Sequence, residues 1–166
     1  MEFVDQIQVN IKAGDGGDGV VRWRRSAGED KGGPAGGDGG DGGDVYVRAV
    51  RDINLLGKYA HKDEFRAENG EDGGSSNRTG AGGEDLVIDL PVGSVIKYAD
   101  RETGFELLEE GEKRLLLAGG EGGLGNTNFK SSTNTTPTKQ TDGKPGEEDD
   151  FLIELKLPVD AGFIGR

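Results

Sequence analysis

Apolar and polar residues alternate in several short stretches of the chain. Near the N-terminus, Phe3, Ile7, Val9 and Ile11 occupy odd positions, which predicts a strand with one buried face. Alternation or short apolar runs predict further strands at residues 20–24, 45–47, 86–90, 95–98, 105–108, 113–117 and 151–157. No stretch has the spacing of an amphipathic helix. We therefore expect an all-β unit of about eight short strands, closed into a barrel or a sandwich.

Glycine recurs at every third position between these strands. Residues 36–44 form three Gly-Gly-Asp triplets, and the same step returns within residues 14–19, 70–83, 119–125 and 143–146. The polyproline II helix has three residues per turn and no internal hydrogen bonds, so edges without side chains let such helices pack backbone against backbone. We expect a backbone-packed projection from the β unit. Its structural glycines would be Gly36, Gly39 and Gly42 on one edge and Gly37, Gly40 and Gly43 on a second.

The composition alone resembles that of a disordered chain, with 32 glycines in 166 residues and a hydrophobic share of 31%. The fixed period argues against disorder, and 5 prolines are too few for collagen. Cysteine is absent, which removes disulfides and thiolate metal sites. No apolar run is long enough for a membrane span, and the N-terminus lacks the apolar core of a signal peptide. We expect a cytoplasmic protein without a membrane partner.

A formal charge of −12 disfavours general adhesion to nucleic acid, so any RNA contact must use local basic patches. Three arginines surround Trp23, a combination that can grip phosphates and stack a base. The alternative, which we favour, places Trp23 in the core. Other cations lie in predicted loops. The expected RNA contacts are Arg22, Arg24, Arg25, Lys31, Arg78, Asn126, Lys130 and Lys139.

Two short motifs suggest other ligands. Residues 14–19 match Gly-x-Gly-x-x-Gly, but strand-like residues follow where a dinucleotide site needs a helix. Residues 36–41 match the start of a calcium-binding β-roll repeat, so a calcium-binding glycine-rich structural repeat protein is the alternative function. We expect these aspartates to be solvated, with no metal site. His61 is the sole histidine and has no catalytic partners, so no catalytic residue is expected.

Ordered blocks over the whole chain resemble the N-terminal domain of the Obg family of GTPases. They lie at residues 3–5, 13–17, 24–25, 31–34, 36–45, 65–70, 91–93, 122–126 and 129–132. The resemblance implies a β-barrel with six glycine-rich left-handed helices. It implies binding to the large ribosomal subunit and its rRNA near the peptidyl-transferase region, in ribosome assembly and the stringent response. Residues 26–30 are less basic than in many members, and Thr135 and Thr138 stand where arginine is often found.

The C-terminal residues resemble the entry to the family's GTPase domain. Residues 160–165 look like a strand that ends in the first glycine of the phosphate loop, Gly165, which would bind nucleotide in the parent protein. We expect residues 1–158 to form the Obg domain and residues 159–166 to begin the GTPase domain. Without the lysine and hydroxyl of that loop, this piece is expected to have no enzyme activity and no cofactor. We also expect it to be a monomer. GTP, GDP and Mg²⁺ would bind to the parent's own GTPase domain.

Overall fold

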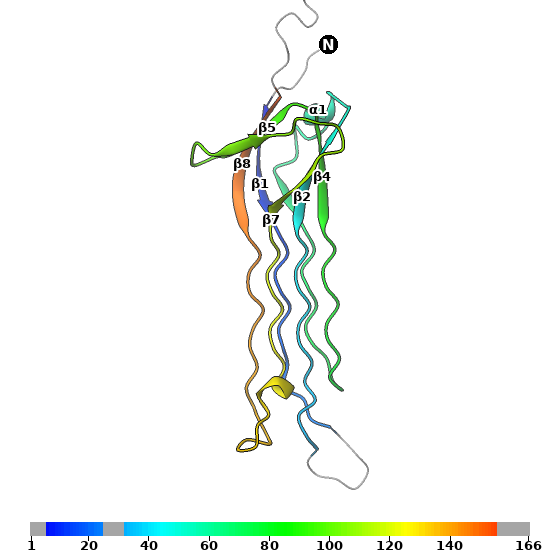
Figure 1. Ribbon diagram of the computed structural model, residues 1–166, viewed down its shortest axis with the longest axis vertical. Coiled ribbons are helices and arrows are strands. Elements are labelled where there is room, and N and C mark those ends of the chain that lie inside the picture. Colours follow the sequence, from blue (N-terminus) through cyan, green and yellow to red (C-terminus); the bar gives the residue numbers. More distant parts are fainter. Residues whose placement is uncertain (1–5, 25–31, 156–166) are drawn as a thin grey trace, which may run out of the picture.

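A computed structural model describes residues 6–24 and 32–155. A β unit lies at one end of the long axis, and glycine-rich segments run away from it side by side (Figure 1). The described β unit contains eight strands and one short helix, α1 (Leu55–Lys58). A 3-10 helix, η1 (Asn126–Phe129), lies near the opposite end.

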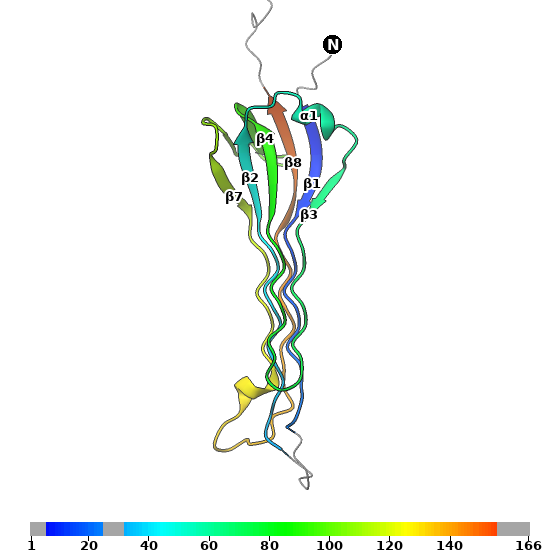
Figure 2. The same ribbon diagram turned by 90° about the vertical axis from the view of Figure 1, so that its right-hand side faces the viewer.

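The eight strands form two sheets. The five-stranded sheet has the order β3-β1-β8-β5-β6, with β3 (Glu64–Arg66), β1 (Gln6–Lys12), β8 (Glu148–Leu155), β5 (Ser94–Tyr98) and β6 (Gly104–Glu106). The three-stranded sheet has the order β4-β2-β7, with β4 (Leu86–Pro91), β2 (Val45–Val50) and β7 (Lys113–Leu117). Strands β1 and β3, like β2 and β4, are parallel, and the other pairs are antiparallel. Figure 2 shows β2, β4 and β7 on one side and β1 and β3 on the other.

The core lies between these strands. Alternate residues of β1, β2 and β8 are buried, which confirms the period read from the sequence. They form one cluster with residues of β4 and β5, including Ile11, Val47, Ile88, Ile96 and Ile153. Burial of each such side chain contributes roughly 1.5–3 kcal/mol. The described pairings account for two sheets, and closure into a barrel stays a prediction.

The strand expected at residues 20–24 is absent from both sheets. Within the described chain, Trp23 only forms an isolated antiparallel bridge with Pro34. The residue keeps 36% of its surface exposed, so the prediction that Trp23 lies in the core is wrong. Its surroundings explain this, because the glycine-rich segments next to it offer few apolar side chains to pack against it.

The glycine-rich segments form a shaft, made of residues 13–22, 33–44, 67–74, 78–85, 118–126 and 139–147. Backbone hydrogen bonds join these segments at intervals of three residues. The N–H groups of Gly14 and Gly17 donate to the carbonyls of Gly43 and Gly40, both at 2.8 Å. The three-residue period of the sequence is therefore the period of the hydrogen bonds. Gly125, with φ −77° and ψ 167°, lies near the polyproline II region.

The shaft glycines are needed because the backbones approach closely. A Cβ on Gly39 would lie 1.9 Å from the Gly17 carbonyl oxygen, and one on Gly42 would lie 2.0 Å from that of Gly14. No described shaft glycine has a positive φ, so left-handed backbone is not the reason. A Cβ on Gly82 would have no neighbour closer than 3.7 Å. The glycines of the shaft are therefore not equivalent.

The second long glycine tract, residues 70–83, does not form one continuous segment of the shaft. The chain reverses at Ser76 and Asn77, which have φ values of 59° and 57°, and the Gly74 N–H donates to the Arg78 carbonyl at 2.8 Å. Residues 67–74 and 78–85 therefore run as two antiparallel segments.

The aspartates of the Gly-Gly-Asp triplets cross-link the shaft. Their Oδ1 atoms accept hydrogen bonds from backbone N–H groups of the segment 118–126: Asp38 from Gly125 at 2.8 Å, Asp41 from Gly122 at 2.8 Å and Asp44 from Gly119 at 2.7 Å. The expectation that these carboxylates are merely solvated is wrong. Each triplet supplies two edges for close packing and one acceptor that satisfies a neighbouring N–H.

Candidate nucleic-acid interface

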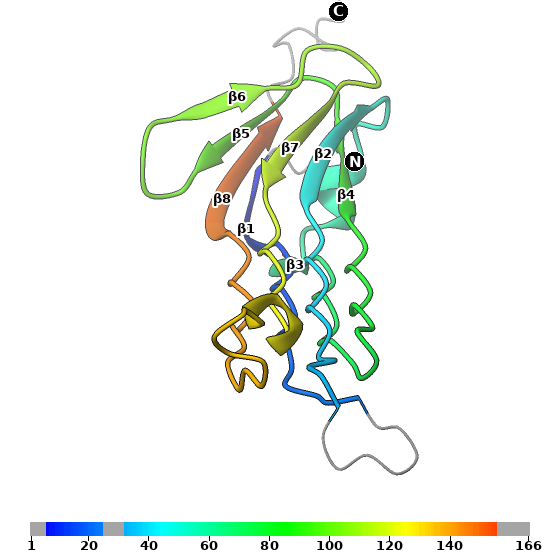
Figure 3. The same cartoon turned by 60° about the horizontal axis from the view of Figure 1, so that its bottom comes forward.

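We define the tip as residues 20–24, 32–37, 75–79 and 126–140. These residues lie at or near the end of the shaft that is remote from the β unit, as Figures 1 and 3 show. Five residues predicted from the sequence as RNA contacts are exposed here: Arg22, Arg24, Arg78, Lys130 and Lys139. The structure therefore brings together cations from three separate parts of the chain.

Asn126 holds three parts of the tip together. Its Oδ1 accepts hydrogen bonds from the backbone N–H groups of Arg22 at 3.2 Å and Gly36 at 2.8 Å. Its Nδ2 donates to the carbonyls of Arg22 and Pro137, both at 3.1 Å. The residue is fully buried, and all four hydrogen bonds of the amide are made. The Asn126 side chain therefore has no capacity left for RNA, and we assign it a positioning role.

Further hydrogen bonds fix the tip segments to one another. The Arg24 N–H donates to the Gly33 carbonyl at 2.9 Å, and the Asn77 N–H donates to the Ala35 carbonyl at 2.8 Å. Asn128 Nδ2 donates to Asp38 Oδ1 at 2.6 Å, which anchors η1 on the shaft. The tip cations therefore stand on a cross-linked backbone.

The tip has positive charges without matching carboxylates. Its defined residues include five cations and no Asp or Glu. In the part of the chain that the structure describes, none of these five forms an ion pair. Outside the tip, ion pairs hold Lys12, Arg48, Arg51, Lys58, Arg66, Lys97, Arg101, Arg114 and Lys144. Lys62 and Lys113 lie over aromatic rings. The unmatched positive charge of the described chain is thus concentrated at the tip.

Some of the other positions singled out in the sequence lie outside the described residues, and others lie in the tip. Arg25, Lys31 and Gly165 lie outside the described residues, as does the expected domain boundary near residue 158. Thr135 and Thr138, which stand where members of the resembled family often have arginine, are exposed in the tip. Lys139 Nζ lies 5.1 Å from the centroid of the Phe129 ring, a contact that leaves its charge unpaired.

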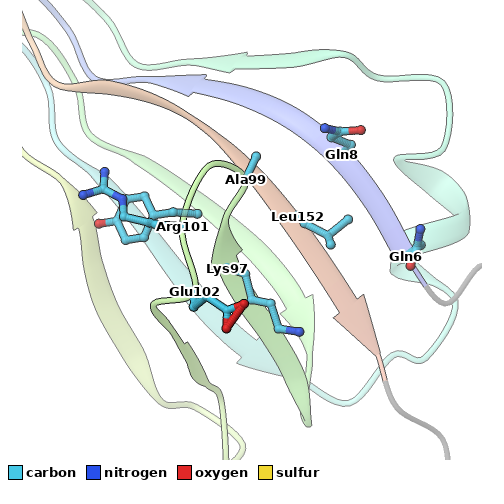
Figure 4. A pocket seen from close by; sticks show the side chains of 8 residues that line it. Gln6, Gln8, Lys97, Ala99, Arg101, Glu102 and Leu152 are labelled. Carbon is cyan, nitrogen blue, oxygen red and sulfur yellow. The ribbon is translucent and has the colours of Figure 1, made fainter.

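A cavity of about 390 Å³ lies in the β unit (Figure 4). Its cations are matched by carboxylates, unlike those of the tip. Lys97 Nζ lies 3.0 Å from Glu154 Oε1, an ion pair without hydrogen-bond geometry, and Arg101 donates to Asp149 at 2.9 Å. The Arg101 guanidinium also lies 4.1 Å from the centroid of the Tyr98 ring. This cavity therefore offers no free charge for an anionic ligand.

The two short glycine motifs both form part of the shaft. A dinucleotide site requires a helix directly after the glycine motif. Residues 14–19 instead form backbone hydrogen bonds with neighbouring segments, and no helix follows them. Residues 36–41 direct Asp38 and Asp41 to backbone N–H groups, as described above. Within residues 6–24 and 32–155, no three acidic or histidine side chains gather closely enough to hold a metal ion. Among these residues, no helix has the length and apolarity to cross a membrane.

Comparison with known proteins identifies relatives that share this sequence pattern. The GTP1/OBG family model matches residues 4–157. A protein named GTPase Obg from Salinibacter ruber (strain DSM 13855 / M31) is 48% identical over 165 residues, which cover 99% of this chain and 49% of that protein. Its namesake from Anaeromyxobacter sp. (strain K) is 48% identical over 168 residues, covering 99% and 47%. The chain spans about half the length of these curated relatives. Because the family model matches most of the chain, the chain belongs to the GTP1/OBG family.

Proposed function

We propose that this chain is the ribosome-binding part of an Obg-type GTPase and that it docks tip first on the large ribosomal subunit, near the peptidyl-transferase region. The tip cations contact rRNA phosphates in this proposal: Arg22, Arg24, Arg78, Lys130 and Lys139, with Arg25 and Lys31 from outside the described residues. The observation that carries the proposal is the set of five tip cations without carboxylate partners. Arg and Lys are the usual partners of RNA phosphates.

The overall charge supports an end-on approach. A chain of net charge −12 is repelled by RNA at most orientations. Screening in physiological salt acts over about 8 Å, so charges on the distant β unit weigh little at the tip. RNA therefore meets attraction at the tip and repulsion along the acidic shaft and β unit. Binding is expected to be oriented as well as salt dependent.

The rest of the proposal follows from family membership. The parent protein is a cytoplasmic GTPase that binds GTP or GDP with Mg²⁺ and acts in ribosome assembly and the stringent response. This part binds rRNA as a monomer and contacts its own GTPase domain. The six shaft segments are left-handed polyproline II helices on a β-barrel, and the three-residue step of their hydrogen bonds supports this geometry.

Binding to isolated large ribosomal subunits tests the proposal through two variants of equal charge. The tip variant replaces four cations by glutamine: Arg22, Arg24, Lys130 and Lys139. The control variant makes the same replacement in the β unit: Arg51, Arg66, Lys58 and Lys62. Because the control cations already face carboxylates or a ring, their loss changes little at the tip.

Co-sedimentation gives the affinity of each variant for the subunits. We expect the tip variant to bind at least tenfold more weakly than the unaltered chain and the control to stay within about threefold. Equal losses in both variants would show that only net charge matters, which would refute docking through the tip. Intact binding by the tip variant would also refute it.

A further inference from the structure

We propose that Trp23 stacks on an unpaired base of the bound RNA, so that the tip combines phosphate contacts with one aromatic platform. This inference rests on the proposed function, since it assigns a contact within the same interface. It begins with the exposure of Trp23, the sole tryptophan of the chain. A large aromatic side chain that is 36% exposed at the end of a shaft leaves apolar surface available to a ligand.

The backbone around Trp23 is held on both sides. Trp23 bridges Pro34, while the Arg24 N–H donates to the Gly33 carbonyl at 2.9 Å and the Ala35 N–H donates to the Arg22 carbonyl at 2.8 Å. The next residue on the N-terminal side, Arg22, is also bonded to the buried Asn126. The aromatic ring therefore stands on a fixed backbone, and less conformational entropy is lost when a base stacks on it.

Cations lie next to Trp23 along the chain and across the bridge. Arg22 and Arg24 are its neighbours in sequence. The Lys130 ammonium lies 4.0 Å from the place that a Cβ on Gly33 would occupy, which brings a cation from the opposite loop to the bridge. An aromatic platform next to cations is the usual composition of a site for single-stranded nucleic acid, because the ring holds a base while the cations hold phosphates.

The surroundings favour RNA over an apolar protein surface. In the described chain, the other exposed large apolar residues are Ile53, Leu108 and Leu115 in the β unit and Leu124, a single side chain in the shaft segment 118–126. The tip loop at residues 130–138 consists mainly of exposed Ser, Thr and Asn. A protein partner that recognised Trp23 would need a contiguous apolar patch, which these polar residues do not provide. Cations and polar side chains around one aromatic ring match an RNA strand.

The test combines measurements of Trp23 fluorescence with measurements of RNA-binding affinity. Protein-free large-subunit rRNA has no tryptophan, so the emission of Trp23 reports directly on its own environment when the unaltered chain binds. Affinity for this rRNA and for intact large subunits is then measured for Trp23→Ala, Trp23→Leu and Trp23→Phe. Trp23→Leu keeps an apolar side chain at the bridge to Pro34 but cannot stack, which separates stacking from support of the tip. Melting temperatures verify that each variant folds.

Stacking predicts quenching of Trp23 on binding and a five- to hundredfold loss of affinity in Trp23→Ala and Trp23→Leu, with most affinity kept in Trp23→Phe. The salt dependence of binding would stay as in the unaltered chain, since no cation is removed. Unchanged emission, or unchanged affinity in Trp23→Leu, would overturn the inference and leave the proposed function intact. Loss of affinity for intact subunits alone would assign Trp23 to a protein contact and also overturn it. Absence of any binding by the unaltered chain would refute the proposed function itself.

Discussion

Asn126 forms hydrogen bonds with both the backbone N–H and the backbone C=O of Arg22, at 3.2 Å and 3.1 Å. The two residues are 104 positions apart in the sequence, so this pair joins the first shaft segment to the fifth. Arg22 carries one of the proposed phosphate contacts, whereas Asn126 is buried behind it. A residue that cannot reach the RNA therefore determines where a contact residue stands.

Replacement of Asn126 is expected to weaken RNA binding through the structure of the tip. In Asn126→Ala the buried Gly36 N–H loses its acceptor, which costs about 1–3 kcal/mol of unfolding free energy. Asn134→Ala removes an exposed amide of the same loop, whose one side-chain hydrogen bond in the described chain is accepted from the exposed Thr136 N–H at 3.2 Å, and should change stability by less than about 0.5 kcal/mol. Urea unfolding and amide hydrogen exchange at residues 20–24 measure both effects. Equal protection in the two variants would contradict the positioning role of Asn126.

Alanine at Gly39 and at Gly82 should have opposite effects on stability. A Cβ at Gly39 would lie 1.9 Å from a backbone oxygen of the adjoining segment, which cannot move without breaking hydrogen bonds. We expect a loss beyond the roughly 1–3 kcal/mol of ordinary overpacking, up to loss of the shaft. A Cβ at Gly82 has room, so Gly82→Ala should be neutral or stabilising by about 0.4–1 kcal/mol. Thermal unfolding compares the two variants, and similar melting temperatures would contradict close backbone packing.

The cross-link from Asp41 to Gly122 should depend on the acceptor oxygen. Asp41→Ala leaves the Gly122 N–H without its partner and should cost about 1–2 kcal/mol. Asp41→Asn keeps an oxygen at the same place and should cost less. Asp142→Ala serves as control, because the Asp142 carboxylate has a single side-chain partner among the described residues, Gln140 at 3.4 Å. Chemical denaturation of the three variants gives the ranking, and an Asp41→Asn variant as unstable as Asp41→Ala would disprove it.

Acid should weaken the shaft through Asp15. A hydrogen bond from the Lys12 side chain, followed by one from the Gly146 N–H, lowers the pKa of the Asp15 carboxyl from its ordinary value of 3.8. Because the carboxyl has the higher pKa in the unfolded chain, the unfolded chain binds a proton more readily as the pH falls below 3.8. The contribution of Asp15 to stability is therefore present above pH 3.8 and is lost as the pH falls through the lower pKa of the folded state. Unfolding free energies between pH 2 and 7 measure it. Lys12→Met removes the largest cause and should reduce the acid dependence; an unchanged profile would contradict this assignment.

Local patterns in the sequence were sufficient for much of the fold. Alternation predicted the buried faces of β1, β2 and β8, and the Gly-Gly-Asp triplets predicted the three-residue step of the shaft. Both features repeat along one segment, so they can be recognised without knowledge of its neighbours. The short elements β3 and α1 lack such repetition and were not predicted.

Contacts between distant segments decided the remaining features. Trp23 was expected in the core because aromatic residues are usually buried, but the segments around it contain too few apolar side chains for one. Asn126 was expected to contact RNA. The sequence around it does not show that its side chain binds the backbone of residues 22, 36 and 137 instead. The glycines on both sides of Pro34, the bridge partner of Trp23, were the available signal that no apolar core could form there.

The salt dependence of binding to large ribosomal subunits tests the central role of the tip cations most directly. The logarithm of the association constant is plotted against the logarithm of salt concentration for the unaltered chain and for the variant with glutamine at Arg22, Arg24, Lys130 and Lys139. Each cation that contacts a phosphate should contribute a slope of about 0.7–0.9, so the variant's slope should be shallower by roughly three. An affinity that is independent of salt, or equal slopes for the two proteins, would contradict the account.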